Sequence, residues 1–429
     1  MTFSFRSHDG QRAYGWLVLL TTLTVLSSGV LSSCAPSTKL PTQNAYGEQA
    51  LVAPNLPADG RILWLMGQDS ETLAAYKAEA LDADPDLPRP GGVTLYTGIS
   101  TGPEEDVLLG LYEAVDYGAG TISFTETLEA YPEAALAIGL ALTDPGGATP
   151  TAALQAIAGF EDAGVTADDV ARARAHVEAL IDYLIEIDRD VFLRIGYEFD
   201  GPWNGYQPAP YKSAFRYIAE RLDAREADRV ATVWQSAAAP MQDPPYRPSD
   251  TVHFETWYPG DDAVDWVGLS VFTPWSVDEN PWGCLDPEAG ALHPARVRDR
   301  IFAFARARDK PVMIGEAAPQ GFETDVPTAG CWSVRAPQPV AVEEVWATWY
   351  VPFFDLVEEN RDVVRAIAYI NTDWNGQAMW QCAEGAPAGD PTCPSGYWGD
   401  SRVQGHPEIL RRFKQELQTP LYVNGAASP

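Results

Sequence analysis

The feature that most constrains this chain is a series of short apolar runs separated by amphipathic segments. Each run is hydrophobic throughout, where a half-exposed strand would alternate between apolar and polar residues. The eight runs are residues 61–66, 92–98, 134–142, 190–198, 230–237, 264–272, 311–317 and 366–372. Continuous hydrophobicity is typical of parallel strands whose outer side is covered by helices, so the sequence predicts an α/β fold.

The segments between the runs have the period of amphipathic helices. Residues 166–187 begin with a capping-box pair, Thr166 and Asp169, and continue with apolar side chains at helical spacing. Residues 211–222 repeat that spacing. Eight strand and helix units predict an enlarged (β/α)₈ TIM barrel with long βα loops over residues 60–420, and a doubly wound sheet is the alternative.

The start of the chain has the pattern of an export signal. Residues 1–33 carry two arginines, then an apolar run that ends in "LSS" before Cys34. This pattern resembles a bacterial lipoprotein signal, which implies cleavage before Cys34, its lipidation, and an exported, membrane-anchored protein. Ala35 favours the outer membrane or cell surface if the cell is Gram-negative. An ordinary signal peptide or a lone transmembrane helix is the alternative.

Two further segments flank the predicted barrel. Residues 34–59 are rich in Pro, Ala and polar residues and have no period, so we expect a flexible tether. Residues 421–429 are expected to form a C-terminal tail. With 46% hydrophobic residues in the whole chain, the remainder is long enough for a large core, and we expect a monomer.

The charge and the cysteines limit the classes of partner. The chain has 29 basic and 60 acidic residues and a formal charge of −31, which disfavours nucleic acid and anionic substrates. Beyond Cys34, four cysteines remain, and export would oxidise them to disulfides. The pairs nearest in sequence are Cys382 with Cys393 and Cys284 with Cys331, and the other pairings stay open. Because the spacings are wide and only five histidines occur, no metal site and no cofactor are predicted.

Barrel enzymes carry their chemistry at the carboxyl ends of the strands. The fourth run ends at Glu198, and the seventh contains Glu316 near its end. Tyr96 and Gln235 lie at other strand ends. The candidate substrate-binding residues lie in the fourth run and the loop after it (Arg194, Tyr197, Trp203 and Asn204) or at other strand ends (Trp234, Trp275, Asn371 and Trp374). Two facing carboxyl groups suit cleavage of a glycosidic bond, and aromatic rings stack on sugars. A neutral polysaccharide or oligosaccharide is therefore the expected partner.

One stretch resembles a known family. Residues 194–203, "RIGYEFDGPW", are similar to the pattern Arg-Pro-x-His-Glu-x-x-Gly-x-Trp of glycoside hydrolase family 26, the β-mannanase family of the retaining clan A. Residues 257–272 and 310–319 are similar to two further strands of that family. The resemblance implies double displacement, with Glu198 as acid/base and Glu316 as nucleophile, and β-mannan as the first substrate to expect. Tyr197 departs from the pattern, since it replaces the His.

Three alternative functions remain open. They are a β-glucanase of a sister clan A family, a transglycosylase, and a non-catalytic surface barrel that binds glycans. The joint presence of Glu198 and Glu316 argues against the last. His253 has no partner at a useful spacing and is interpreted as incidental.

Overall fold

The computed structural model describes residues 51–102, 107–116, 118–144, 150–160, 164–277, 291–321, 327–328, 338–380 and 398–425. Its main sheet closes into a barrel, because β1 pairs in parallel with β3 on one side and β13 on the other. In order around the wall, the strands are β1 (Ile62–Gly67), β3 (Gly92–Gly98), β6 (Ala135–Ala141), β7 (Val191–Ile195), β8 (Val230–Ser236), β9 (Trp266–Val271), β10 (Val312–Ala317) and β13 (Val364–Ile370). All eight predicted runs form these strands, which confirms the (β/α)₈ barrel.

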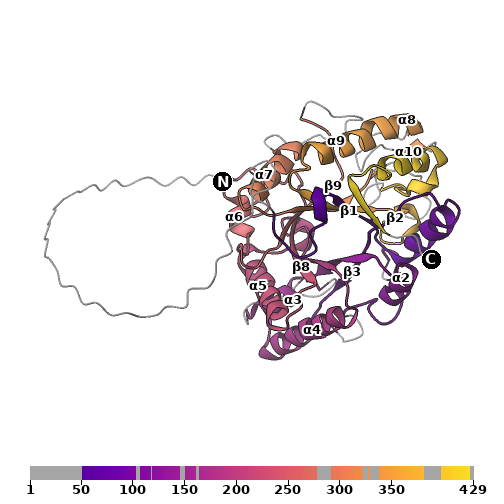
Figure 1. Cartoon of the computed structure of the whole chain (residues 1–429). Helices are drawn as coiled ribbons and strands as arrows, with labels where there is room; N and C mark the ends of the chain where they lie inside the picture. The colour runs from indigo at the N-terminus through magenta and orange to yellow at the C-terminus, as the bar shows by residue number, and fades with distance from the viewer. Residues whose placement is uncertain are drawn as a thin grey trace, which may run out of the picture.

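Helices surround this barrel, with α2 to α5 along one part of its wall and α7, α9 and α10 along the opposite part (Figure 1). The helices are α1 (Ser70–Tyr76), α2 (Phe124–Ala130), α3 (Ala152–Ala158), α4 (Ala167–Glu186), α5 (Pro208–Ala224), α6 (His253–Trp257), α7 (Pro294–Arg306), α8 (Val342–Val345), α9 (Val351–Glu359) and α10 (Pro407–Leu417). The predicted capping box forms at the start of α4, where Thr166 and Asp169 each accept a backbone N–H from the other.

The long βα loops carry short strands of their own. After β3, β4 (Val115–Asp116) pairs with β5 (Thr121–Ile122), and after β10, β11 (Pro327–Thr328) pairs with β12 (Gln338–Pro339). Both additions lie on connections that leave the carboxyl ends of strands, where a barrel carries its site.

The barrel interior changes from apolar to polar along the strands. Alternate residues of each strand point inward, and the inward residues near the amino ends form one apolar cluster. This inner cluster is Leu63, Leu65, Ala137, Phe192, Ala231, Val233, Trp266, Met313, Ala366 and Ala368. Toward the carboxyl ends the inward positions become polar, with Thr94, Arg194, Gln235 and Ser270. The polar end is therefore the end that can hold a site.

The segment just before β1 covers the apolar end of the barrel. Ala53 and Leu56 pack against the inner cluster, and the indole N–H of Trp266 donates to the carbonyl oxygen of Pro54 at 3.0 Å. The prediction of a flexible tether over residues 34–59 was therefore wrong for these last residues. The apolar strand ends need a cover, and this segment supplies it.

The C-terminal segment is also part of the fold. Strand β14 (Tyr422–Gly425) pairs in parallel with β1 and antiparallel with β2 (Arg89–Pro90). The predicted tail over residues 421–429 was therefore wrong up to residue 425, because hydrogen bonds to β1 and β2 order this strand. Residues 426–429 lie outside the described residues.

Several predictions fall outside the described residues. Cys34, Cys284, Cys331, Cys382 and Cys393 all lie there, so the lipidation and the disulfide pairs stay predictions. Among the residues that are described, none of the helices is both long enough and apolar enough to cross a membrane.

Candidate active site

The two predicted catalytic acids lie at the polar end of the barrel and are joined by a chain of hydrogen bonds. Glu198 follows β7 and is half-buried, and Glu316 in β10 is buried. Ser270 Oγ donates to Glu198 Oε1 at 2.7 Å and accepts from Gln235 Nε2 at 3.0 Å. Arg194 Nη1 lies 3.2 Å from Gln235 Oε1 and 2.9 Å from Glu316 Oε1. The strand ends thus place both acids in one polar network.

Glu316 is held by a cation and a phenol. The hydroxyl of Tyr96 donates to Glu316 Oε1 at 2.7 Å, and Arg194 forms its ion pair with the same oxygen. Arg194 is fully buried, and its guanidinium lies over the rings of Tyr96 at 4.8 Å and Tyr197 at 5.5 Å. A glycine makes room for this arrangement, because a Cβ on Gly139 would lie 2.3 Å from the Tyr96 ring. Arg194 therefore binds an acid of the site, a contact that its place in the fourth run led us to expect beside its predicted role at the substrate.

The aim of Glu316 depends on an irregularity in β10. Met313 points inward, so regular alternation would turn Glu316 toward the helices. The pairing of β10 with β9 shifts its register between Ile314 and Glu316. Such a shift of one residue exchanges the two faces of a strand, and Glu316 points into the barrel as a result.

Glu198 has a contrasting environment. Trp203 Nε1 donates to Glu198 Oε2 at 2.9 Å, and Ser270 donates to the other oxygen. Burial raises the pKa of Glu198 to about 8, and the negative charges of Glu316 and Asp200 also raise it. The two hydrogen bonds oppose this rise only in part. Glu198 therefore carries a proton at neutral pH.

The loop after β7 holds Trp203 and Asn204 in different roles. Trp203 lies in a single helical turn, η4 (Pro202–Asn204), and is 54% exposed. A Cβ on Gly201 would lie 2.3 Å from the indole of Trp203, so only glycine permits this packing. Asn204 Nδ2 donates to the carbonyl oxygens of Tyr197 and Glu198, both at 3.0 Å. Asn204 thus supports the loop, and its role in sugar binding stays a prediction.

Trp234 does not face the site. It is buried between β8 and the helices and stacks on Phe199 with ring centroids 4.4 Å apart. Its neighbours Val233 and Gln235 point into the barrel, and alternation therefore directs Trp234 outward. The prediction of Trp234 as a substrate-binding residue was wrong.

Trp275 and Asn371 are buried and form hydrogen bonds that stabilise loops. Trp275 is buried, and its indole N–H donates to the carbonyl oxygen of Thr348. Asn371 is also buried, where its Oδ1 accepts from Val403 N at 2.8 Å and its Nδ2 donates to Gln404 Oε1 at 3.1 Å. Both predictions of substrate binding are corrected, because these polar groups already have protein partners.

Trp374 lies beside the end of β10, just beyond β13. It packs with Ala318, two residues past Glu316, and its ring centroid is 5.7 Å from that of Trp398. Only 2% of Trp374 is exposed. The platform beneath a sugar stays a prediction.

Three side chains outside the predicted catalytic and substrate-binding residues complete the network, namely Tyr96, Gln235 and Ser270. Tyr96 and Gln235 stand out in the sequence as polar groups at strand ends, and Ser270 is a polar residue inside an apolar run. Each occupies an inward position, so counting in steps of two along β3, β8 and β9 would have identified them.

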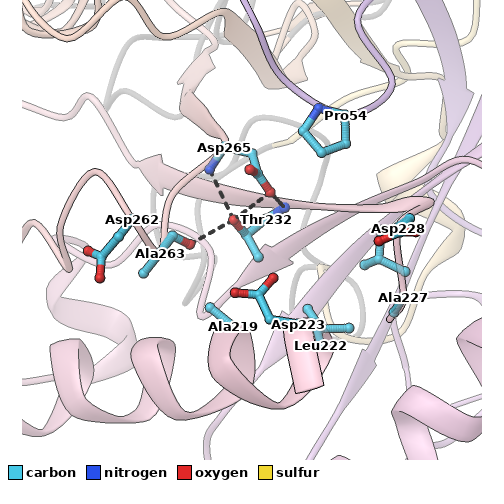
Figure 2. A pocket seen from close by; sticks show the side chains of 11 residues that line it. Pro54, Ala219, Leu222, Asp223, Ala227, Asp228, Thr232, Asp262, Ala263 and Asp265 are labelled. Atoms are coloured by element: carbon cyan, nitrogen blue, oxygen red, sulfur yellow. Dashed lines mark hydrogen bonds between the residues drawn. The ribbon is translucent and has the colours of Figure 1, made fainter. Parts of the chain in front are cut away.

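A pocket lies at the opposite end of the barrel from the two acids. Figure 2 shows it at the amino ends of β8 and β9, where Thr232 contacts Asp265. Asp265 Oδ2 accepts from Thr232 N at 2.8 Å and from Thr232 Oγ1 at 3.0 Å. Acidic side chains line this pocket without an aromatic ring, which does not suit sugar binding. Throughout the described part of the chain, no three His, Cys, Asp or Glu residues are grouped so as to hold a metal ion.

Comparison with known proteins identifies the family. No family model matches the chain. A β-1,3-xylanase from Alcaligenes sp. is 30% identical over 383 residues, which cover 89% of this chain and 68% of that protein. β-1,3-xylanase TXYA from Vibrio sp. is 31% identical over 382 residues, which cover 88% of this chain and 69% of that protein. The chain belongs to the β-1,3-xylanase family. It is therefore a glycosidase, as the strand ends predicted.

Solved structures bear on the fold of this family member. The catalytic domain of a family 26 endo-β-1,4-mannanase from Bacillus sp. JAMB-750 superposes with a TM-score of 0.50 at 12% identity, covering 91% of this chain and 96% of that one. The resemblance to glycoside hydrolase family 26 is thus confirmed at the level of the barrel fold. The named members of the β-1,3-xylanase family act on a β-linked polysaccharide.

Proposed function

We propose that the chain hydrolyses β-1,3-linked xylan with retention of configuration, using Glu198 as acid/base and Glu316 as nucleophile. The observation that carries the proposal is the contrast between the two acids. Glu198 has a pKa raised to about 8, whereas Glu316 receives the charge of Arg194 and the hydroxyl of Tyr96. One environment favours the protonated form of a carboxyl group and the other favours the carboxylate, which suits one proton donor and one nucleophile.

The first step forms a glycosyl ester. Both donors bind Oε1 of Glu316, so we assign the attack on the anomeric carbon to Oε2. As that bond forms, the glycosidic bond breaks and the proton of Glu198 passes to the leaving oxygen. Arg194 and Tyr96 then contact the carbonyl oxygen of the ester.

The second step returns both acids to their starting states. Glu198, now a carboxylate, takes a proton from water while the water oxygen attacks the anomeric carbon. The ester bond breaks and its electron pair returns to Glu316. Two inversions at one carbon give net retention.

The choice of xylan is supported by the relatives, which are named β-1,3-xylanases at 30% and 31% identity. The earlier expectation of β-mannan is supported only by structures near 12% identity, which bear on the fold alone. Tyr197, in place of the family 26 His, also alters the site that a mannosyl ring would enter. Mannan and glucans therefore become the alternatives in the test.

The experiment compares polysaccharides on the chain without its first 33 residues. We expect release of xylo-oligosaccharides from β-1,3-xylan at least 10-fold faster than any product from β-1,4-xylan, β-1,4-mannan, β-1,3-glucan or mixed-linkage glucan, since polar groups matched to one sugar discriminate strongly. Proton NMR of the first product should show the β-anomer. The Glu316→Gln variant is the matched control for contaminating activity. Preference for mannan, or a first product of α-configuration, would overturn the proposal.

A further inference from the structure

A buried carboxylate and imidazole lie directly behind the acid/base. Asp200 and His253 are each 3% exposed, and His253 Nε2 is 3.0 Å from Asp200 Oδ2. Ser236 Oγ donates to the same oxygen at 2.7 Å, and the backbone N–H of Ala237 donates to Oδ1 at 2.7 Å. Both carboxylate oxygens of Asp200 therefore have buried partners. The interpretation of His253 as incidental was wrong, because the fold brings it to an acid 53 residues away.

This cluster does not have the geometry of a nucleophilic triad. In such a triad the serine hydroxyl contacts the imidazole, which removes its proton. Here Ser236 donates to Asp200, and Ser236 and His253 are both buried. The cluster is suited to fixing a segment of chain and not to reacting with a substrate.

The segment that it fixes has a costly conformation. Glu198 has a φ of 52°, in the left-handed region, where any residue other than glycine is strained. Such a conformation persists when its surroundings over-determine it. Asn204 donates to the carbonyl oxygens of Tyr197 and Glu198 in this loop. Phe199, which follows Glu198, packs against the rings of Trp234 and Trp257.

We propose that Asp200, anchored by His253 at the start of α6, is a positioning residue that holds Glu198 in this conformation and aims its carboxyl group at the glycosidic oxygen. The proposal rests on the proposed role of Glu198 as acid/base. Through the contact between His253 and Asp200, helix α6 contributes to proton transfer. Neither Asp200 nor His253 contacts the substrate in this account.

The charge of Asp200 has a second effect on Glu198. The charged groups that influence Glu198 are Glu316 on β10 and Asp200 in its own loop, and Ser270 and Trp203 are its neutral hydrogen-bond donors. Asp200 raises the pKa of Glu198, so a neutral residue at position 200 should lower that pKa. The basic limb of kcat/KM should then move to lower pH.

The test measures how the rate depends on the leaving group. The substrates are aryl β-1,3-xylobiosides. The need to protonate the leaving oxygen increases from dinitrophenol to nitrophenol to phenol. General acid catalysis contributes about 10²- to 10⁴-fold, so Asp200→Ala should lose at least about 10-fold in kcat/KM on the phenyl substrate and less than about 3-fold on the dinitrophenyl substrate. His253→Ala should show the same pattern. His253→Gln should restore most of the loss, because the glutamine amide can take the place of Nε2.

Asp200→Asn keeps the shape of the side chain and protects the test from a failure to fold. It should show a smaller loss with the same leaving-group dependence, together with the shifted basic limb. Asp265→Asn is the matched control, since Asp265 is a half-buried acid that binds Thr232 at the opposite end of the barrel (Figure 2). This control should lower thermal stability without changing the leaving-group dependence.

The outcomes separate the two proposals. A loss of equal size on all three substrates in the Asp200 and His253 variants would overturn the positioning role. If instead Glu198→Ala itself showed no leaving-group dependence, the assignment of the acid/base would fail, and the positioning role would fail with it.

Discussion

At the scale of single residues, Glu198 combines function with a cost to stability. The folded protein raises its pKa to about 8, chiefly through burial and then through the charge of Glu316. The folded state thus binds this proton more tightly than the unfolded chain does. By linkage, the free energy of unfolding falls as pH rises from the ordinary pKa of a glutamate, about 4.3, to the folded value.

Glu198→Gln should remove this loss of stability. The variant cannot ionise at this position, so its melting temperature should exceed that of the parent by a margin that grows between pH 5 and pH 9. Differential scanning calorimetry across this range measures the margin. A margin that is constant with pH, or that shrinks toward alkaline pH, would contradict the raised pKa.

At the scale of elements, the sequence predicts where the strands lie along the chain better than which way their side chains point. The eight runs identify the strands because parallel strands of a barrel are apolar along their whole length. The end of β7 and the position of Glu316 in β10 follow from the same runs. The inward aim of Glu316 does not follow, because it depends on the register shift between Ile314 and Glu316. Trp234 was misplaced for the related reason that a continuous apolar run does not reveal which face is inner.

The sequence also does not reveal contacts between segments that are distant along the chain. The pairing of His253 with Asp200 needs α6 to pack on the loop after β7. The fastening of Asn371 to Val403 needs the chain after β13 to return to the barrel mouth. No local pattern encodes either contact, since each joins residues more than 30 positions apart.

Trp374 allows a test at the end of β13. Its position beside Ala318 predicts that Trp374→Ala lowers kcat strongly, because the sugar at the cleavage point loses its platform. Since Trp374 is also buried, the same change should cost about 3–5 kcal/mol of stability. Trp374→Phe keeps an aromatic face and should retain more activity than the alanine variant at equal folded fraction. Equal activity of the two variants, measured well below their melting temperatures, would assign Trp374 to the core alone.

At the scale of the whole molecule, the two ends of the barrel have different tasks. Ala53 and Leu56 cover the apolar floor, and Glu198 and Glu316 lie at the opposite end. The chain therefore enters the barrel at the floor, away from the mouth. We propose that the protein is an exported lipoprotein anchored through Cys34.

Replacement of Cys34 tests the anchor. In the parent, the protein should label with radioactive palmitate and sediment with membranes, because acylation at Cys34 supplies the anchor. Cys34→Ala should abolish both properties while the activity per folded molecule stays unchanged. Equal membrane association of the two proteins would contradict lipidation at this residue.

The division of labour between Glu198 and Glu316 is the central claim, and azide rescue tests it most directly. In Glu198→Ala, the dinitrophenyl leaving group needs no proton, so Glu316 still forms the glycosyl ester, and azide should release it as the β-glycosyl azide. In Glu316→Ala, azide should attack the substrate directly and give the α-glycosyl azide at a much lower rate. NMR of the two products decides the matter. A β-azide from Glu316→Ala, or undiminished hydrolysis by that variant without azide, would contradict the account.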